Sequence, residues 1–137
     1  IIIYRYMEIL EQYILELEKD IRIDEFTIRE VQMKLPAYKH KWVGRLMRHK
    51  LELSQLYGKK SQLLNRLVKK VQETSTYNVA KPTAEKALEN HDTIISLNTE
   101  IDQMKLLVEF LEKSERILSS MTFDVKNLVE IMKLETT

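Results

Sequence analysis

The sequence has little of what strand-rich or disulfide-linked proteins need. Its 137 residues include two glycines, two prolines and no cysteine. Sheets need many turns, and glycine and proline make most of them, so their scarcity favours a few long helices. The lack of cysteine excludes disulfides and thiolate metal sites, and it is typical of proteins in a reducing compartment.

Long hydrophobic runs are also lacking. No stretch approaches the roughly 18 apolar residues of a membrane span, so no membrane association is expected. Residues 1–6 do not have the basic and long apolar segments of a secretory signal. Because a cleaner amphipathic pattern opens at Met7, residues 1–6 are either extraneous, from upstream translation or a vector, or native chain. Both interpretations stay open.

Positive charge is concentrated in one segment, although the net charge is only +1. Residues 36–72 contain ten basic side chains and one acidic side chain, Glu52, for a net charge of +9. Residues 1–35 have a net charge of −3, and residues 73–137 have −5. A chain with this distribution is expected to present a basic patch.

Hydrophobic periodicity predicts one all-helical domain over residues 1–137. Short helices are expected in residues 7–35, the first beginning at Met7 and the second capped by Asp24. Proline is favoured in the first turn of a helix and unfavourable in its interior. We therefore expect Pro36 to start a long basic helix over residues 36–72, and a kink in one continuous helix is the alternative.

The rest of the chain is predicted to be a linker followed by helices. Residues 73–92 are rich in serine, threonine and asparagine and contain a proline, which indicates a flexible linker. Residues 93–135 are predicted to form a long helix, capped by Asp92 or Thr93, and then a short C-terminal helix. A break between these two is expected at residues 119–122.

Each long helix has a seam of residues at alternating spacings of three and four. The first seam consists of Trp42, Leu46, His49, Leu53, Leu56, Lys60, Leu63 and Leu67. The second consists of Ile94, Leu97, Ile101, Met104, Val108, Leu111, Glu115 and Leu118. Two such seams joined by a linker predict a long antiparallel helical hairpin. Apolar residues in excess of a hairpin core predict self-association, and these are Trp42, Val43, Met47, Leu51, Tyr57 and Leu64.

Six cations of the basic helix line one side of it. At about 100° per residue, all six lie within about 40° of the first of them. These residues, which we call the cationic ridge, are Lys41, Arg45, Arg48, Lys59, Arg66 and Lys70. The ridge is roughly 44 Å long. Its field is broadened by Lys39, Lys50, Lys60 and Lys69. A linear row of cations suits a linear polyanion such as nucleic acid, because each phosphate contact releases counterions.

Aromatic residues occur among these cations. Tyr38, Trp42 and Tyr57 are candidates for stacking on unpaired bases, and core packing is the alternative for Trp42. The ridge itself has two other interpretations, a solvated face or a docking site for acidic segments of the same chain. Its nearly uniform sign favours nucleic acid, because solvated faces usually mix charges.

No catalytic constellation accompanies the basic helix. His40, His49 and His91 lack metal-ligand spacing, and there is no nucleophile paired with a base. The protein is therefore interpreted as a non-enzyme without a cofactor.

Several segments resemble the UvsY family, the recombination mediators of T-even-like tailed phages. Lys41-Trp42 resembles a pair near the start of that family's long helix. Lys59-Lys60 with Arg66 resembles its basic motif, although Leu64 stands where a lysine is expected, and Lys69 and Lys70 are near enough to compensate. The similar segments near the two ends of the chain are residues 17–24, residues 110–112 and residues 121–130.

The resemblance implies an all-helical subunit that assembles into a ring of six or seven copies. It implies binding of single-stranded DNA, of the phage single-strand-binding protein and of a RecA-like recombinase, which the mediator loads onto covered DNA. The expected location is the cytoplasm of the infected bacterial host. Two other functions stay open: a helical assembly or scaffold protein whose basic helix docks a protein partner, and an architectural protein that binds double-stranded DNA.

Overall fold

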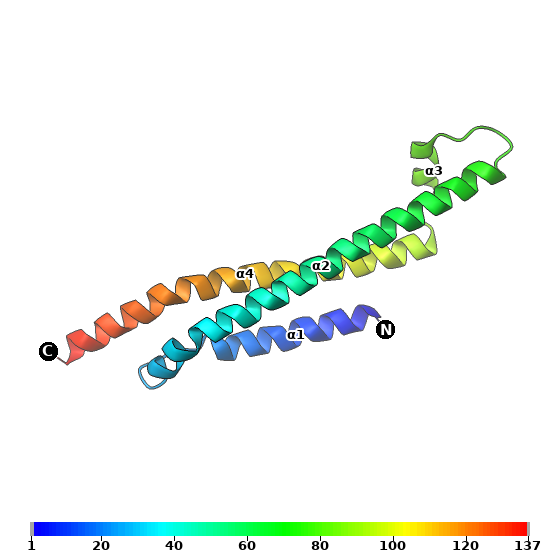
Figure 1. Ribbon diagram of the computed structural model, residues 1–137. Coiled ribbons are helices and arrows are strands. Elements are labelled where there is room, and N and C mark those ends of the chain that lie inside the picture. Colours follow the sequence, from blue (N-terminus) through cyan, green and yellow to red (C-terminus); the bar gives the residue numbers. More distant parts are fainter. Residues whose placement is uncertain (1, 137) are drawn as a thin grey trace.

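The computed structural model describes the backbone of residues 2–136 and the side chains of residues 5–136, and that part of the chain has four helices and no strand. The helices are α1 (Ile2–Asp20), α2 (Ile28–Thr74), α3 (Lys81–Ala87) and α4 (Asp92–Glu135). Figure 1 shows α2 and α4 side by side in opposite directions, with α1 next to them. The predicted all-helical class and antiparallel hairpin are confirmed.

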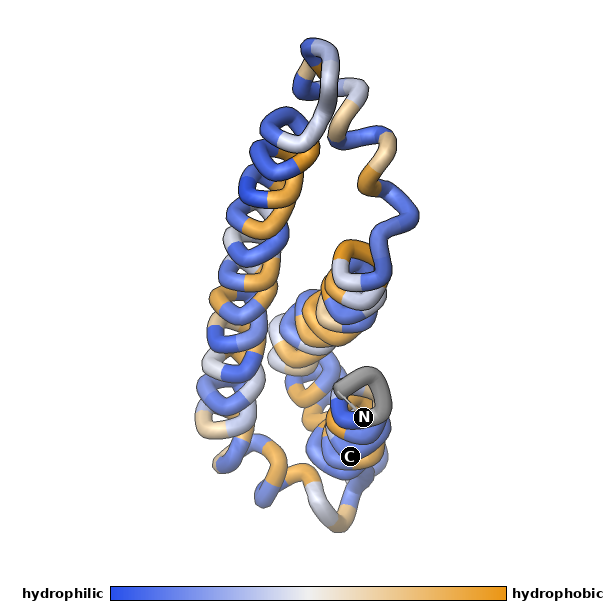
Figure 2. The backbone as a smooth tube through the Cα atoms, turned by 90° about the vertical axis from the view of Figure 1, so that its right-hand side faces the viewer, coloured by the Kyte–Doolittle hydropathy of each residue, from blue (hydrophilic) through white to orange (hydrophobic). Residues whose placement is uncertain are grey.

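The two seams meet between α2 and α4. Every predicted seam position is buried or half-buried, both from Trp42 to Leu67 and from Ile94 to Leu118. Figure 2 shows the hydrophobic residues of α2 gathered along the side that faces α4. The largest fully buried side chains are Trp42, Met104, Leu107, Leu111, Leu118 and Ser114. This core holds the two long helices in a fixed register.

Pro36 lies inside α2, so the predicted start of the long helix at residue 36 is wrong and the alternative of a continuous helix holds. Proline lacks the N–H group that would bond to the carbonyl of Gln32. Both residues are exposed, so water can reach that carbonyl. On the opposite side of the same turns, Val31 and Leu35 are buried, and this burial offsets the lost hydrogen bond.

The linker between α1 and α2 is organised by Asp24. Its carboxylate accepts the backbone N–H groups of Phe26 at 2.8 Å and Thr27 at 2.9 Å. These hydrogen bonds hold the pKa of Asp24 below its ordinary value. Asp24 therefore caps the turn that leads into α2, while the helix itself begins at Ile28.

α4 is one unbroken helix, so the predicted break at residues 119–122 is wrong. The Ser120 hydroxyl donates to the carbonyl of Ile117 at 2.8 Å, within the helix. Met121 and Val125 continue the buried stripe past the serines. Tertiary burial here outweighs the low helix propensity of serine and threonine.

The N-terminal end of α4 is capped by His91. Its Nδ1 atom accepts the backbone N–H of Thr93 at 3.3 Å. The prediction that Asp92 or Thr93 is the cap is therefore wrong by one or two residues. Asp92 lies in the first turn instead, where its negative charge interacts favourably with the helix dipole.

α1 packs against the hairpin over more of its length than the sequence predicted. Leu17 is buried, while Tyr6, Ile9, Leu10 and Tyr13 are half-buried against the same core. The helix predicted to begin at Met7 therefore includes earlier residues, and Tyr6 takes part in the packing. Of the six residues with two open interpretations, the side chains of residues 1–4 lie outside the described part of the chain.

The predicted linker over residues 73–92 contains a short helix, α3. Ala84 and Leu88 are buried with Val68 of α2 in a second, smaller hydrophobic cluster. Leu64, one of the apolar residues in excess of the predicted hairpin core, packs against this cluster. The linker is thus folded back onto the end of α2 (Figure 1).

Replacing Trp42 by alanine should lower the free energy of unfolding by about 3–5 kcal/mol, because its removal leaves a large cavity. The side chain is 0% exposed, whereas that of Val43, the next residue, is 38% exposed. Val43→Ala is therefore the matched control and should cost less than about 1 kcal/mol. Urea unfolding followed by circular dichroism measures both. Equal losses would contradict the place of Trp42 in the core.

Candidate nucleic-acid interface

Four of the six cations of the ridge are open to solvent. These residues, which we call the open ridge, are Arg48, Lys59, Arg66 and Lys70. Lys69 beside them is exposed, and Lys60 is half-buried at its seam position. The open ridge extends over about 33 Å of helix at 1.5 Å per residue. Because one rigid helix carries all four, their spacing is fixed before any ligand binds.

The other two cations, Lys41 and Arg45, face α1 and are covered by it. Arg45 donates from both terminal nitrogens to the two carboxylate oxygens of Glu16. Lys41 donates to Glu16 at 3.2 Å and to Asp20 at 2.5 Å. The structure therefore divides the predicted ridge into an open ridge and a covered pair, Lys41 and Arg45, docked on acidic residues of the same chain.

Trp42 lies in the core beneath the covered pair. Its indole N–H donates to Asp20 at 2.8 Å, and its ring meets those of Tyr13 and Phe110 edge-on, with centroids 5.7 and 6.3 Å apart. The Arg45 guanidinium lies 4.8 Å from the Trp42 ring centroid. With its indole 0% exposed, Trp42 has no free face for a base in this arrangement.

The two other candidate stacking residues lie apart from the open ridge. Tyr38 is half-buried against the core, with the Lys41 ammonium 5.2 Å from its ring centroid. Tyr57 is 42% exposed and lies next to Lys105 of α4, whose ammonium is 5.7 Å from the ring centroid. At about 100° per residue, Tyr57 is about 160° around α2 from Lys41. The structure therefore does not bring Tyr57 together with the ridge cations.

A groove of mixed polar and apolar lining borders the open ridge. Two adjoining pockets of about 600 and 390 Å³ share Lys59 of α2 and Glu100 of α4. The second pocket reaches Arg66 and is lined on the α4 side by Thr93 and Ser96. The groove therefore places hydrogen-bonding side chains and two carboxylates, Glu52 and Glu100, next to cations.

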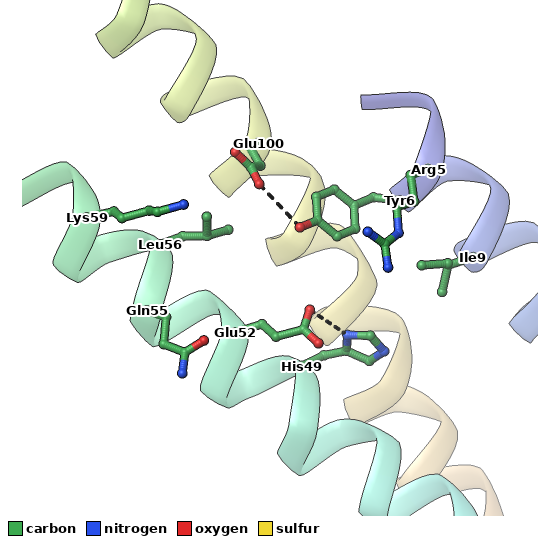
Figure 3. Close-up of a pocket in the computed structure, with 9 residues that line it drawn as sticks. All are labelled: Arg5, Tyr6, Ile9, His49, Glu52, Gln55, Leu56, Lys59 and Glu100. Carbon is green, nitrogen blue, oxygen red and sulfur yellow. Dashed lines mark hydrogen bonds and ion pairs between the residues drawn. The ribbon is translucent and has the colours of Figure 1, made fainter. Parts of the chain in front are cut away.

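Arg5 and Tyr6 contribute to this groove and were missed at the sequence level. Figure 3 shows the Tyr6 ring projecting from α1 towards Glu100, with Arg5 beside it, and the Tyr6 hydroxyl donates to Glu100 at 3.3 Å. Burial, and then the Glu100 carboxylate, raises the pKa of Tyr6. The helical spacing of Tyr6 with Ile9 and Tyr13 indicates that the first helix includes Tyr6. The sequence could not use this spacing, because residues 1–6 could be extraneous.

His49 lies between the core and the groove. Its Nε2 atom is 3.0 Å from the hydroxyl of Tyr13, and its Nδ1 atom is 3.4 Å from the carboxylate of Glu52. Burial raises the pKa of Tyr13, which favours the protonated hydroxyl at this contact. The Tyr13–His49 contact links α1 to α2, and the Glu52 carboxylate gives His49 a second contact on its other side.

The described residues contain no group of three or more histidine, aspartate or glutamate side chains arranged to hold a metal ion. None of the helices in the same part of the chain has the length and apolarity to cross a membrane.

Comparisons with known proteins concern most of the chain. The family model described as recombination, repair and ssDNA binding protein UvsY matches residues 16–137. The crystal structure of the bacteriophage T4 recombination mediator protein UvsY is similar with a TM-score of 0.78 and 19% identity, covering 92% of this chain and 98% of that chain. No curated protein matches the sequence. At this identity the structural likeness shows the fold, and the family match includes α2, α3, α4 and the end of α1.

Replacing Glu16 by glutamine should remove stability that is present near neutral pH. Hydrogen bonds from Arg45 and then from Lys41 hold the pKa of Glu16 below its ordinary value of 4.5. A lowered carboxyl pKa stabilises the fold fully above that ordinary value, and the contribution is lost as pH falls through the lowered value. Urea unfolding over a pH series should show the wild-type advantage shrinking in acid. A difference that does not change with pH would contradict the ion pairs.

Proposed function

Because the chain belongs to the UvsY family of recombination, repair and ssDNA binding proteins, we propose that it is a recombination mediator. In this proposal it binds single-stranded DNA in the infected bacterial host. It promotes the loading of a RecA-like recombinase onto DNA that is covered by single-strand-binding protein. The single observation that carries the DNA-binding step is the open ridge.

The open ridge supports phosphate binding through its charge and its exposure. Within residues 5–136, none of its four cations forms a salt bridge, so their donors are available to a ligand. Each phosphate that such a cation contacts releases condensed counterions, which makes binding favourable and sensitive to salt. Contacts to phosphates alone have no sequence preference, as a mediator that acts on any single strand requires.

The groove beside the ridge supports a preference for single strands. Bases of an unpaired strand can turn away from their phosphates and reach side chains that a duplex would keep out of range. Gln62 of α2 and Thr93 and Ser96 of α4 supply hydrogen-bonding groups there. Lys59 and Arg66 border the same groove, so phosphate and base contacts come from adjacent turns of α2.

Self-association into a ring of six or seven subunits is part of this proposal. Val43, Met47 and Leu51 form an exposed apolar stripe on α2, with 38%, 58% and 60% of each residue exposed. A stripe of this kind is best buried against another protein surface. Several copies of the open ridge in one assembly would turn weak individual contacts into tight binding by multivalency.

Replacing Arg48 and Arg66 together by alanine should weaken binding to a fluorescent single-stranded oligonucleotide at low salt. The slope of log K against log salt should fall by about 1.4, because each phosphate that an arginine neutralises contributes about 0.7 to it. The matched control is Lys113→Ala with Arg116→Ala on α4, which removes the same charge from exposed positions away from the groove. Fluorescence anisotropy across a salt series measures both.

The size of the assembly should be measured for all three proteins, so that a loss of binding is not a loss of assembly. Equal weakening by both double variants would mean that net charge, rather than the open ridge, governs binding. No binding by the wild-type assembly at low salt would contradict the proposal and reassign the basic side of α2 to docking of a protein partner.

Loading of the recombinase is tested by order of addition. A RecA-like recombinase should form filaments faster on DNA already covered by single-strand-binding protein when the wild-type chain is present. The variant without Arg48 and Arg66 should lose most of this acceleration, because a mediator must hold the strand while the proteins exchange. Acceleration by the variant equal to that by the wild type would separate loading from DNA binding through the open ridge.

A further inference from the structure

The covered pair of the ridge is bound by anions that resemble a phosphate in shape and charge. The guanidinium of Arg45 forms two parallel hydrogen bonds with the carboxylate of Glu16, the geometry that arginine also uses with phosphate. Lys41 lies between two carboxylates, those of Glu16 and Asp20. Lys41 and Arg45 therefore bind carboxylates of α1 at the position that a nucleic-acid backbone lying along the ridge would occupy.

The geometry points to α1 as an internal competitor for the nucleic acid: Glu16 and Asp20 occupy Lys41 and Arg45 until a bound strand displaces them. Displacement would lengthen the cationic track from the open ridge to the full ridge, by about 10 Å of helix. This inference rests on the proposed function, because it names how access to the same DNA-binding surface is regulated.

The ion pairs between α1 and α2 are of a kind that a polyanion can exchange. The side chain of Glu16 is 37% exposed, that of Lys41 29% and that of Arg45 19%, whereas that of Asp20 is only 10% exposed. Solvent and ligand therefore reach the covered pair first at Glu16. Water and salt reach the exposed side of Glu16 and weaken its ion pairs by screening. A phosphate that replaces the carboxylate conserves the charge and the hydrogen bonds of the cation.

The apolar hold of α1 is partial. Leu17 is buried, and Tyr6, Ile9, Leu10 and Tyr13 are half-buried against the core. Ile14 and Leu15 on the outer side are 38% and 57% exposed. α1 is joined to α2 by a short linker, so it can move away from Lys41 and Arg45 and stay attached to the rest of the molecule. The α2–α4 seam, which holds most of the core, does not need to open for this motion.

Displacement of α1 has a built-in reporter, the single tryptophan. Trp42 is covered from the α1 side by Asp20 and Tyr13 and from the α4 side by Phe110. If α1 moves off, the indole loses its hydrogen bond and gains water on one side. Its emission should then shift to longer wavelength, and acrylamide should quench it more strongly.

The test compares Glu16→Gln with Glu18→Gln in the full chain, using a single-stranded oligonucleotide across a salt series. Both variants remove one negative charge from α1, but Glu18 is exposed and two residues away from the contact with α2. Glu16→Gln should bind about fivefold more tightly than wild type, a coupling typical of linked sites. Its salt slope should be steeper by up to about 1.4, because Lys41 and Arg45 would each neutralise a further phosphate. Glu18→Gln should behave like wild type.

The effect of Glu16→Gln on DNA affinity should disappear when the two cations of the covered pair are replaced. In a background with Lys41→Gln and Arg45→Gln, the further change Glu16→Gln should leave the affinity unaltered. Trp42 emission of the wild-type chain supplies a readout without any substitution, and it should shift when a long oligonucleotide is added in excess.

The outcomes separate this inference from the proposed function. Equal affinities for wild type, Glu16→Gln and Glu18→Gln, with Trp42 emission unchanged by DNA, would overturn the inference alone. Weaker binding by Glu16→Gln would also overturn it and would make Glu16 a support of the site. No binding by any of the three proteins would overturn the proposed function, and the inference with it.

Discussion

Burial of the seam between α2 and α4 is the interaction on which the other features depend. Trp42 on α2 and Met104, Leu107 and Leu111 on α4 are almost fully removed from water. With these residues fixed, the rotation of α2 about its own axis is fixed too. The cations of the ridge then lie beside the seam, next to the polar side of α4 and within reach of α1. The direction of the basic side is thus a consequence of core packing and not of the charges themselves.

This arrangement gives one helix side two different environments. Towards the end of α2 near α3, the open ridge borders the groove and faces solvent. Towards the other end, α1 supplies two carboxylates to the covered pair. A short linker joins the acidic α1 to the basic α2, so the competing carboxylates are always present at high local concentration. In the inference above, this controls the access of nucleic acid to Lys41 and Arg45. The same contact shields Trp42, so the core and the interface are coupled at one place.

Sequence patterns predicted the parts of the fold that depend on one helix at a time. The seam spacing from Trp42 to Leu67 was sufficient to predict the buried side of α2, since periodicity reports burial directly. Pro36 was misplaced because its cost depends on whether water reaches the carbonyl of Gln32, which is a tertiary property. The break predicted at residues 119–122 failed because burial of Met121 and Val125, also a tertiary property, outweighs the low helix propensity of serine and threonine. The contact of Glu16 with Arg45 joins two helices. From the sequence, docking of an acidic segment on the ridge was an alternative interpretation, but the pattern of a single helix does not indicate which residues meet.

Lysine acetylation footprinting, with mass spectrometry, tests the central claim most directly. If single-stranded DNA lies on the basic side of α2, saturating oligonucleotide should protect Lys59, Lys69 and Lys70 from acetylation, while Lys113 and Lys126 on α4 stay reactive. Lysine reactivity depends on access to the ammonium group, and each of these five residues is exposed in the free chain. Protection confined to α4, or no protection on α2 under conditions where DNA is bound, would contradict the account.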